Sequence, residues 1–311
     1  MTSPSTGSEG RDPSHEHRPD AESRPDSDRA EGQRFVLHKP GGDPVKTGRN
    51  LPVAIISGCV LGALVLLTIF PWPQLFTIIT VAGVLIGLRE VNRAFVGKGV
   101  KPALVPLAVG GALMQPAAHF GGAEWLVGAT ALTAVACLVW RLRGGQDGFV
   151  ADVSANLFIL VYLPFLFGIW QLLIAHPEDG QFRLIAFIVV TISSDIGGYF
   201  AGILLGRHRM APVISPNKTW EGFGGSVVAC AVAGALCVVL MLDGPWWVGA
   251  VLGLAVVFAA TVGDLIESLF KRDLGVKDMG SFMPGHGGLM DRLDSLLIAS
   301  PVAWVVLSLL L

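Results

Sequence analysis

Long apolar segments separated by short polar loops are the feature that most constrains this chain. Nine of them have roughly the 17 to 25 residues that a helix needs to cross a bilayer. Because lipid leaves backbone groups to be satisfied within each segment, we predict an all-α, polytopic integral membrane protein with about nine transmembrane helices. The segments lie at 51–70, 74–96, 102–120, 124–141, 153–175, 183–206, 222–242, 245–268 and 289–311.

Composition supports the same class of protein. Of the 311 residues, 52% are hydrophobic and 15% are charged, and the mean hydropathy is +0.62, which excludes an ordinary soluble domain. Lys and Arg are spread over the loops without forming a basic domain, so we expect no nucleic-acid partner. Cys59, Cys137, Cys230 and Cys237 lie in apolar runs without CxxC spacing, which favours small buried side chains over metal ligands.

Three regions follow from this pattern. Residues 1–50 carry almost no large apolar side chains, which predicts a disordered tail. Residues 51–175 form the N-terminal transmembrane helices, and the first apolar run is too long for a secretory signal. Residues 176–311 form a C-terminal transmembrane region that we expect to be catalytic.

The charges of the loops predict an orientation. Loops after the odd-numbered segments contain Lys or Arg only at Arg183 and carry tryptophans instead, whereas those after the even-numbered segments are basic. The positive-inside rule then places the N-terminal tail and the even loops in the cytoplasm. The basic residues are Arg89, Arg93, Lys98, Lys101, Arg141, Arg143, Arg207, Arg209, Lys218, Lys271, Arg272 and Lys277.

Carboxylates in the last third predict a metal site. Asp264 lies about 18 residues, at roughly 1.5 Å each, from the outer end of its segment, which brings it to the cytoplasmic boundary of the hydrocarbon. Counting back from the C-terminus puts Asp291 and Asp294 at a similar depth. Three carboxylates at one level repel one another unless a cation lies between them, and oxygen ligands favour Mg²⁺. A stripe of Asp264, Ser268 and Lys271 follows helical spacing, and Asp291 and Asp294 are i and i+3.

The connection between these segments suits a polyphosphate. Lys271, Arg272, Lys277 and Asp278 precede Gly280 and the run 284–288, which contains His286, Gly287 and Gly288. A glycine-rich turn before a helix offers free backbone N–H groups, and the bases add positive charge. Two alternatives remain open: His286 as a turn residue bonded to backbone, and bases that only obey the positive-inside rule.

Two further stretches carry polar residues. Asp195 lies halfway along 183–206, where an ionised side chain is costly and marks a site, a polar pathway or a structural partner. Lys218 and Glu221 lie on the loop before 222–242, where charges are less costly, so this loop alone would be a weak signal.

The motifs resemble those of the phosphatidate cytidylyltransferase family. Ser268–Arg272, Lys277–Asp278, Gly280, Pro284–Gly288 and Asp291–Asp294 look like its signature, with Ser215–Gly222 and Ser194–Tyr199 similar to two further motifs. The match covers about 191–295. Met283 stands where Leu, Ile or Phe is usual, and Ile196 and Gly198 replace Thr and Ala, which affects packing and no charge.

The resemblance implies a homodimeric helical membrane enzyme of phospholipid biosynthesis in the bacterial plasma (inner) membrane. Its substrates would be CTP and phosphatidate, drawn from the cytoplasm and the membrane lipids. It implies Mg²⁺ held by Asp264, Asp291 and Asp294, with room for a second, monovalent cation such as K⁺. We predict catalytic roles for Lys271, Arg272, Lys277, Asp278, His286 and Asp195. We predict substrate contacts from Ser215, Asn217, Lys218, Thr219, Glu221, Ser268, Gly287, Gly288 and Arg292.

Two other functions compete with this one. The first is another membrane nucleotidyl- or phosphotransferase, although the chain lacks a DxxDGxxAR run. The second is an ion-coupled transporter, which predicts polar residues leading to both faces of the membrane. The outer halves of the segments look apolar, which favours an enzyme.

Overall fold

The computed structural model describes residues 62–280 and 288–311, which belong to one unit of the chain. Within them, seven helical segments are long and apolar enough to cross a membrane, which confirms an all-α membrane fold. The number nine stays a prediction, because residues 51–61 lie outside the described part; residues 62–69 are helical. The helices are α2 (Pro73–Val96), α3 (Leu104–Arg141), α4 (Phe149–Leu160), η2 (Val161–Phe165), α5 (Leu166–Ile174), α6 (Gly180–Leu205), α7 (Trp220–Met241), α8 (Trp246–Leu274) and α9 (Met290–Leu310).

The segment α3 is two helices that fold back on each other. Gly122 has φ 72° and ψ −162°, outside the helical region and accessible mainly to glycine. The Thr130 hydroxyl lies 4.0 Å from the Met114 sulfur, although 16 residues of straight helix would separate them by about 24 Å. The chain therefore reverses at Gly122, in agreement with separate segments at 102–120 and 124–141.

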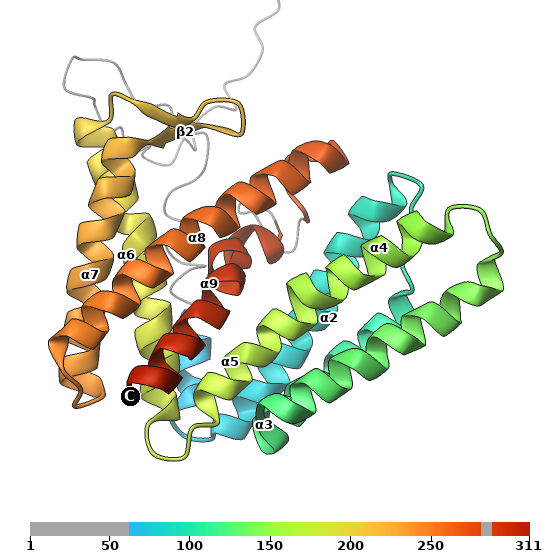
Figure 1. Ribbon diagram of the computed structural model, residues 1–311, viewed down its shortest axis with the longest axis horizontal. Coiled ribbons are helices and arrows are strands. Elements are labelled where there is room, and N and C mark those ends of the chain that lie inside the picture. The colour runs from blue at the N-terminus through green and yellow to red at the C-terminus, as the bar shows by residue number, and fades with distance from the viewer. Residues whose placement is uncertain (1–61, 281–287) are drawn as a thin grey trace, which may run out of the picture. The chain divides into compact units, whose positions relative to one another are not determined.

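The site-bearing ends of the last helices gather on one side. Figure 1 shows the β-hairpin, the end of α8 and the start of α9 at one end of the bundle, and the C-terminus at the other. The basic loops that follow α6 and α8 are therefore at the same end, as their charge pattern predicts.

The sequence analysis placed Lys218 and Glu221 on a loop, and the structure corrects this: Lys218 lies on a strand and Glu221 in the first turn of a helix. Strand β1 (Arg209–Ala211) pairs antiparallel with β2 (Ser215–Thr219), and α7 starts directly afterwards. Helix α8 also continues past the predicted end at 268 to Leu274, so Lys271 and Arg272 lie on a helix. Its 29 residues span about 44 Å, more than the ~30 Å of hydrocarbon, so its last turns can lie beyond the lipid.

Small residues let α6, α7 and α8 pack backbone to backbone. A Cβ at Gly197 of α6 would lie 2.7 Å from the carbonyl oxygen of Gly225 on α7, and a Cβ at Gly234 would strike the backbone of Gly249 on α8. Membrane helices associate through such close contacts because lipid supplies no hydrophobic driving force between them. These three helices pack together and contribute residues to the polar motifs.

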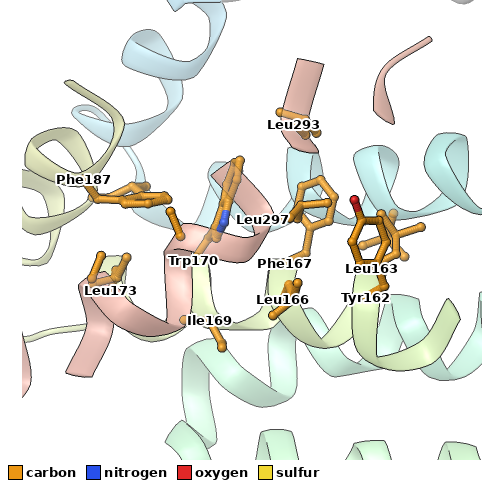
Figure 2. Packing of buried hydrophobic residues seen from close by; sticks show 14 of the residues in the cluster. Tyr162, Leu163, Leu166, Phe167, Ile169, Trp170, Leu173, Phe187, Leu293 and Leu297 are labelled. Atoms are coloured by element: carbon orange, nitrogen blue, oxygen red, sulfur yellow. The ribbon is translucent and has the colours of Figure 1, made fainter. Parts of the chain in front are cut away.

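Large apolar side chains fill the space between η2, α5 and α9. Figure 2 shows Leu163, Phe167 and Trp170 facing Leu293 and Leu297 of α9, and all five are buried. This layer fixes α9 against the N-terminal half of the chain. Cys137, Cys230 and Cys237 are buried free thiols, as predicted, while Cys59 lies outside the described residues.

The region around Gln171 of α5 is more polar than the sequence suggested. Buried Gln171 accepts from the Thr77 hydroxyl at 3.0 Å, donates to the Thr80 hydroxyl at 2.6 Å and lies 3.1 Å from a ring nitrogen of His119. The network contains no carboxylate among the described residues.

Candidate functional site

A cavity of about 280 Å³ opens where α6, α7, α8, α9 and the β-hairpin meet. It brings together residues of the Ser194–Tyr199 motif, residues of the Ser215–Gly222 motif and the carboxylate of Asp264, which are far apart in the sequence. The polar side chains that line it include Asp195, Asn217, Lys218, Thr219, Asp264 and Ser295.

Helix α6 supplies Asp195, whose side chain is exposed to the cavity. The neighbouring wall depends on a glycine, because a Cβ at Gly198 would lie 2.6 Å from the hydroxyl of Ser226 on α7. That hydroxyl donates to the Ser194 carbonyl at 2.6 Å and ties α7 to α6 beside the cavity. Gly198 therefore suits Ser226, and Ile196 is 52% exposed on the helix surface, so neither departure from the family pattern disturbs the site.

Strand β2 supplies Lys218, which forms an ion pair with Asp264 of α8. The next residue, Thr219, caps α7 by accepting the Gly222 N–H at 3.1 Å. The hairpin thus holds an ammonium group over the carboxylate of α8, inside the cavity. The sequence predicted both residues in the site, Asp264 from helical rise and Lys218 from the family resemblance, and gave no indication that they pair.

Lys271 connects α8 to α9. Its ammonium group lies 2.7 Å from Glu267 Oε2 and 3.0 Å from Asp291 Oδ1. The other oxygen of Asp291 accepts the backbone N–H groups of Met279 at 3.0 Å and Gly288 at 2.8 Å. Asp291 is therefore directed toward Lys271 and the connection between the helices.

Glu267 is a site residue that the sequence reasoning missed. It is 1% exposed, and its Oε1 has no hydrogen-bond partner among the described residues. Its carboxylate lies against that of Asp294, which also interacts with Asp264. The hydroxyl of buried Tyr162 likewise lacks a partner within the described part. The signal was present, because Glu267 is i+3 from Asp264 and shares its helix face.

The carboxylate oxygens are chemically suited to bind a hard cation. The described side chains, however, are not gathered around one point. Asp264, Asp294 and the unpartnered oxygen of Glu267 are oxygen ligands of the kind that Mg²⁺ prefers. Asp291, however, is engaged by Lys271 and two backbone amides. Among the described residues, no three His, Cys, Asp or Glu side chains are arranged to hold one metal ion. The magnesium site stays a prediction.

Two of the predicted site residues hold the loops around the cavity. Arg272 donates to the Val213 carbonyl and so connects α8 to the hairpin. Glu221 accepts the backbone N–H groups of Arg207 and His208 at 3.1 Å, and lies 2.6 Å from the His208 ring.

The remaining predicted residues are dispersed. Ser215 and Ser268 are partly buried and are not among the lining residues; Lys277 and Asp278 are exposed beyond the end of α8. Arg292 is exposed at the start of α9, close enough to Asp195 to act on it electrostatically. His286 and Gly287, together with Met283, lie outside the described residues.

The fold and cavity define an integral membrane protein with a carboxylate- and lysine-lined site at one end of its helices. A model of the cytidylyltransferase family matches residues 52–310. The chain belongs to this family, whose members are nucleotidyltransferases.

Relatives support the assignment over most of the chain. A phosphatidate cytidylyltransferase of Mycobacterium bovis is 37% identical over 291 residues, which cover 89% of this chain and 94% of the relative. The phosphatidate cytidylyltransferase of Mycobacterium leprae is 37% identical over 290 residues, 85% of this chain and 90% of the relative. That of Haemophilus influenzae is 36% identical over 148 residues, 45% of this chain and 51% of the relative.

Proposed function

We propose that this chain is a phosphatidate cytidylyltransferase that converts CTP and phosphatidate into CDP-diacylglycerol and pyrophosphate for phospholipid biosynthesis. The observation that carries the proposal is the cavity, in which Lys218 and Asp264 meet Asp195 at one end of the transmembrane helices. The names of relatives that align over about nine-tenths of both chains point to the same reaction.

The reaction is an in-line transfer between phosphates. A phosphate oxygen of phosphatidate forms a bond to the α-phosphorus of CTP, and the bond from that phosphorus to the bridging oxygen of the β-phosphate breaks, so pyrophosphate leaves with the electron pair. The nucleophile is already an anion, so the protein needs no strong base. Catalysis then rests on positioning and on neutralising charge.

Lys218 is the base best placed to neutralise phosphate, because it lines the cavity and is only 28% exposed. Phosphates that enter the cavity would compete with Asp264 for the ammonium group of Lys218. Lys271 is not among the residues that line the cavity; it lies between Glu267 and Asp291, and we assign it to holding those carboxylates. Arg272 fixes the hairpin, while Lys277 is exposed and available to phosphates that approach from outside.

The carboxylates would hold Mg²⁺, with Asp264 and Asp294, which interact electrostatically, joined by Asp291 after it turns from Lys271. Bound there, the ion would supply charge neutralisation for the CTP phosphates. The chain's own contribution is the fixed position of these oxygens on α8 and α9. A second, monovalent cation is part of the same proposal.

The site would face the cytoplasm, where CTP arrives, with phosphatidate entering from the adjacent leaflet. The positions of the basic loops after α6 and α8 support this orientation. A single cysteine introduced at exposed Val213 of the hairpin, in a chain whose own cysteines are replaced by Ala, should react with a membrane-impermeant maleimide only in inverted vesicles. Labelling of this cysteine in intact cells would contradict the proposed orientation and indicate the opposite one.

The reaction is tested with detergent-purified protein, phosphatidate, Mg²⁺ and each of the four nucleoside triphosphates, by following pyrophosphate and the lipid product. Of the four nucleotides, we expect only CTP to give a lipid product, CDP-diacylglycerol. Asp294→Asn should abolish it, and Glu124→Gln, which neutralises an exposed carboxylate outside the cavity, should not. A folded wild-type protein without turnover on any nucleotide would contradict the proposal and favour transport. Light scattering of the same preparation tests the proposed homodimer.

A further inference from the structure

Glu90 of α2 lies against the start of α9, although 199 residues separate it from Leu289. The side chain is buried, with 8% of its surface exposed. Its Oε1 accepts the Leu289 N–H at 3.0 Å, and its Oε2 accepts the Met290 N–H at 3.1 Å. Both oxygens of this carboxylate are therefore used by the backbone at the beginning of α9.

Helix α9 needs such a partner. The first N–H groups of a helix have no acceptor within the helix, and leaving them unpaired away from water is costly. The residue at the N-cap position is Leu289, which provides no side-chain cap. A carboxylate also interacts favourably with the positive end of the helix dipole. Glu90 therefore does for α9, from another helix, what a local Asp or Ser does elsewhere.

Two glycines let the backbone close over this carboxylate. A Cβ at Gly280 would strike Glu90 Oε1 and lie 2.7 Å from Glu90 Cγ, and a Cβ at Gly288 would lie 2.5 Å from Oε2. Both are needed for space. Gly280 and Gly288, the signature glycines on either side of residues 281–287, therefore leave the space that the Glu90 side chain occupies.

The same backbone holds a predicted metal ligand. The Gly288 N–H donates to Asp291 Oδ2 at 2.8 Å, one residue before the first amide that Glu90 accepts. Asp294 follows Asp291 by i+3 on the same face of α9. A shift of residues 288–290 would therefore move both carboxylates relative to α8.

We infer that Glu90 is a positioning residue for the proposed cytidylyltransferase reaction. It anchors the start of α9 so that Asp291 and Asp294 face α8. Glu90 is not among the residues that line the cavity, and its oxygens are already paired with backbone amides. It acts through α9, without touching the substrates.

The test compares Glu90→Gln and Glu90→Ala with wild type by Mg²⁺ titration of CTP-dependent turnover. Changes in the partners of metal ligands typically weaken metal affinity by roughly 10-fold to 100-fold, and we expect the Mg²⁺ half-saturation to rise within that range. Gln can accept one amide and presents its NH₂ to the other, so its effect should be the smaller. Amide exchange at residues 289 and 290 should accelerate in both variants.

Asp179→Asn is the matched control. Asp179 is a partly buried carboxylate that, like Glu90, has two partners, here Arg183 and His176, each at 2.6 Å, and it does not line the site cavity. It should lower thermal stability and leave the Mg²⁺ half-saturation unchanged. If Glu90→Gln behaves in the same way, or leaves amide exchange at wild-type rates, the inference is wrong.

Two further measurements keep the result decisive. Should both Glu90 variants fail to fold, Gly280→Ala presses on the same carboxylate and should raise the Mg²⁺ half-saturation; an unchanged value would overturn the inference. Should wild type lack turnover, the proposed function fails on its own. Mg²⁺-dependent protection of the amides of 288–295 in wild type and Glu90→Gln then decides the role of Glu90, and equal protection in both refutes it.

Discussion

Replacing Gly225 by Ala should separate α6 from α7 and disturb the cavity between them. A Cβ at this position would strike the Cβ of Ala201 and lie 2.7 Å from the Gly197 carbonyl oxygen. Both obstacles are fixed to the α6 backbone and cannot rotate away. The next residue offers a control, because a Cβ at Gly224 has nothing within 4 Å.

The magnitude follows from two opposing effects. Gly→Ala within a helix favours the folded state by roughly 0.5–1 kcal/mol through backbone entropy, and this gain is common to both variants. Forcing an extra methyl group into a packed interface costs about 1–3 kcal/mol, and only Gly225→Ala carries this cost. The difference in unfolding free energy between the two variants therefore isolates the packing cost, at about 1–3 kcal/mol.

The assay is thermal unfolding of both variants in one detergent, together with CTP-dependent turnover. Gly225→Ala should unfold several degrees below Gly224→Ala, at roughly 2–4 °C per kcal/mol for a protein of this size. It should also lose turnover, because α6 carries Asp195 and the start of α7 is capped by Thr219, and both residues line the cavity. A Gly225→Ala midpoint equal to or above that of Gly224→Ala would refute the backbone-to-backbone contact.

Three other substitutions test separate parts of the structure. Lys218→Met should lower CTP turnover by about 10²–10³-fold in the pyrophosphate assay, as expected for a lost electrostatic contact, with Lys218→Arg retaining part of it; wild-type turnover would contradict its role. Thr219→Ala should destabilise α7 by about 1 kcal/mol in thermal unfolding, and Thr219→Ser should restore the cap. Asp152→Asn removes the negative charge that lies 2.7 Å from buried Arg141, whose other hydrogen bonds go to backbone carbonyls. It should cost roughly 3–5 kcal/mol of unfolding free energy, with unchanged affinity for CTP in the folded fraction.

Helix positions were predictable because the bilayer imposes a minimum apolar length, and the sequence meets it repeatedly. The reversal within 104–141 was also predictable, since two bilayer-length segments with few polar residues between them must turn back. The depth of Asp264 followed from counting helical rise. Its pairing with Lys218 did not follow, because the hairpin that carries Lys218 folds back through contacts that local spacing does not encode.

Other misses have their own physical causes. Strand β2 contains Pro216, and a five-residue strand gives no periodic signal long enough to be distinguished from a loop. Glu267 escaped notice because the helical stripe was drawn through Ser268, although i+3 and i+4 neighbours lie on the same face. The direction of Asp291 depends on the amides of Met279 and Gly288, which belong to the connection between two helices.

The N-terminal half shows why a catalytic motif can be recognised while its support cannot. The ring of Phe270, one residue before Lys271, lies 5.4 Å from that of Phe95 and 5.1 Å from that of Phe158, so α2 and α4 hold the end of α8 by aromatic packing. Such packing asks only for size and shape, which many side chains satisfy. Glu90 is the exception, because two backbone amides at fixed positions require a carboxylate. The site is therefore built from C-terminal residues whose geometry depends on helices that carry no signature.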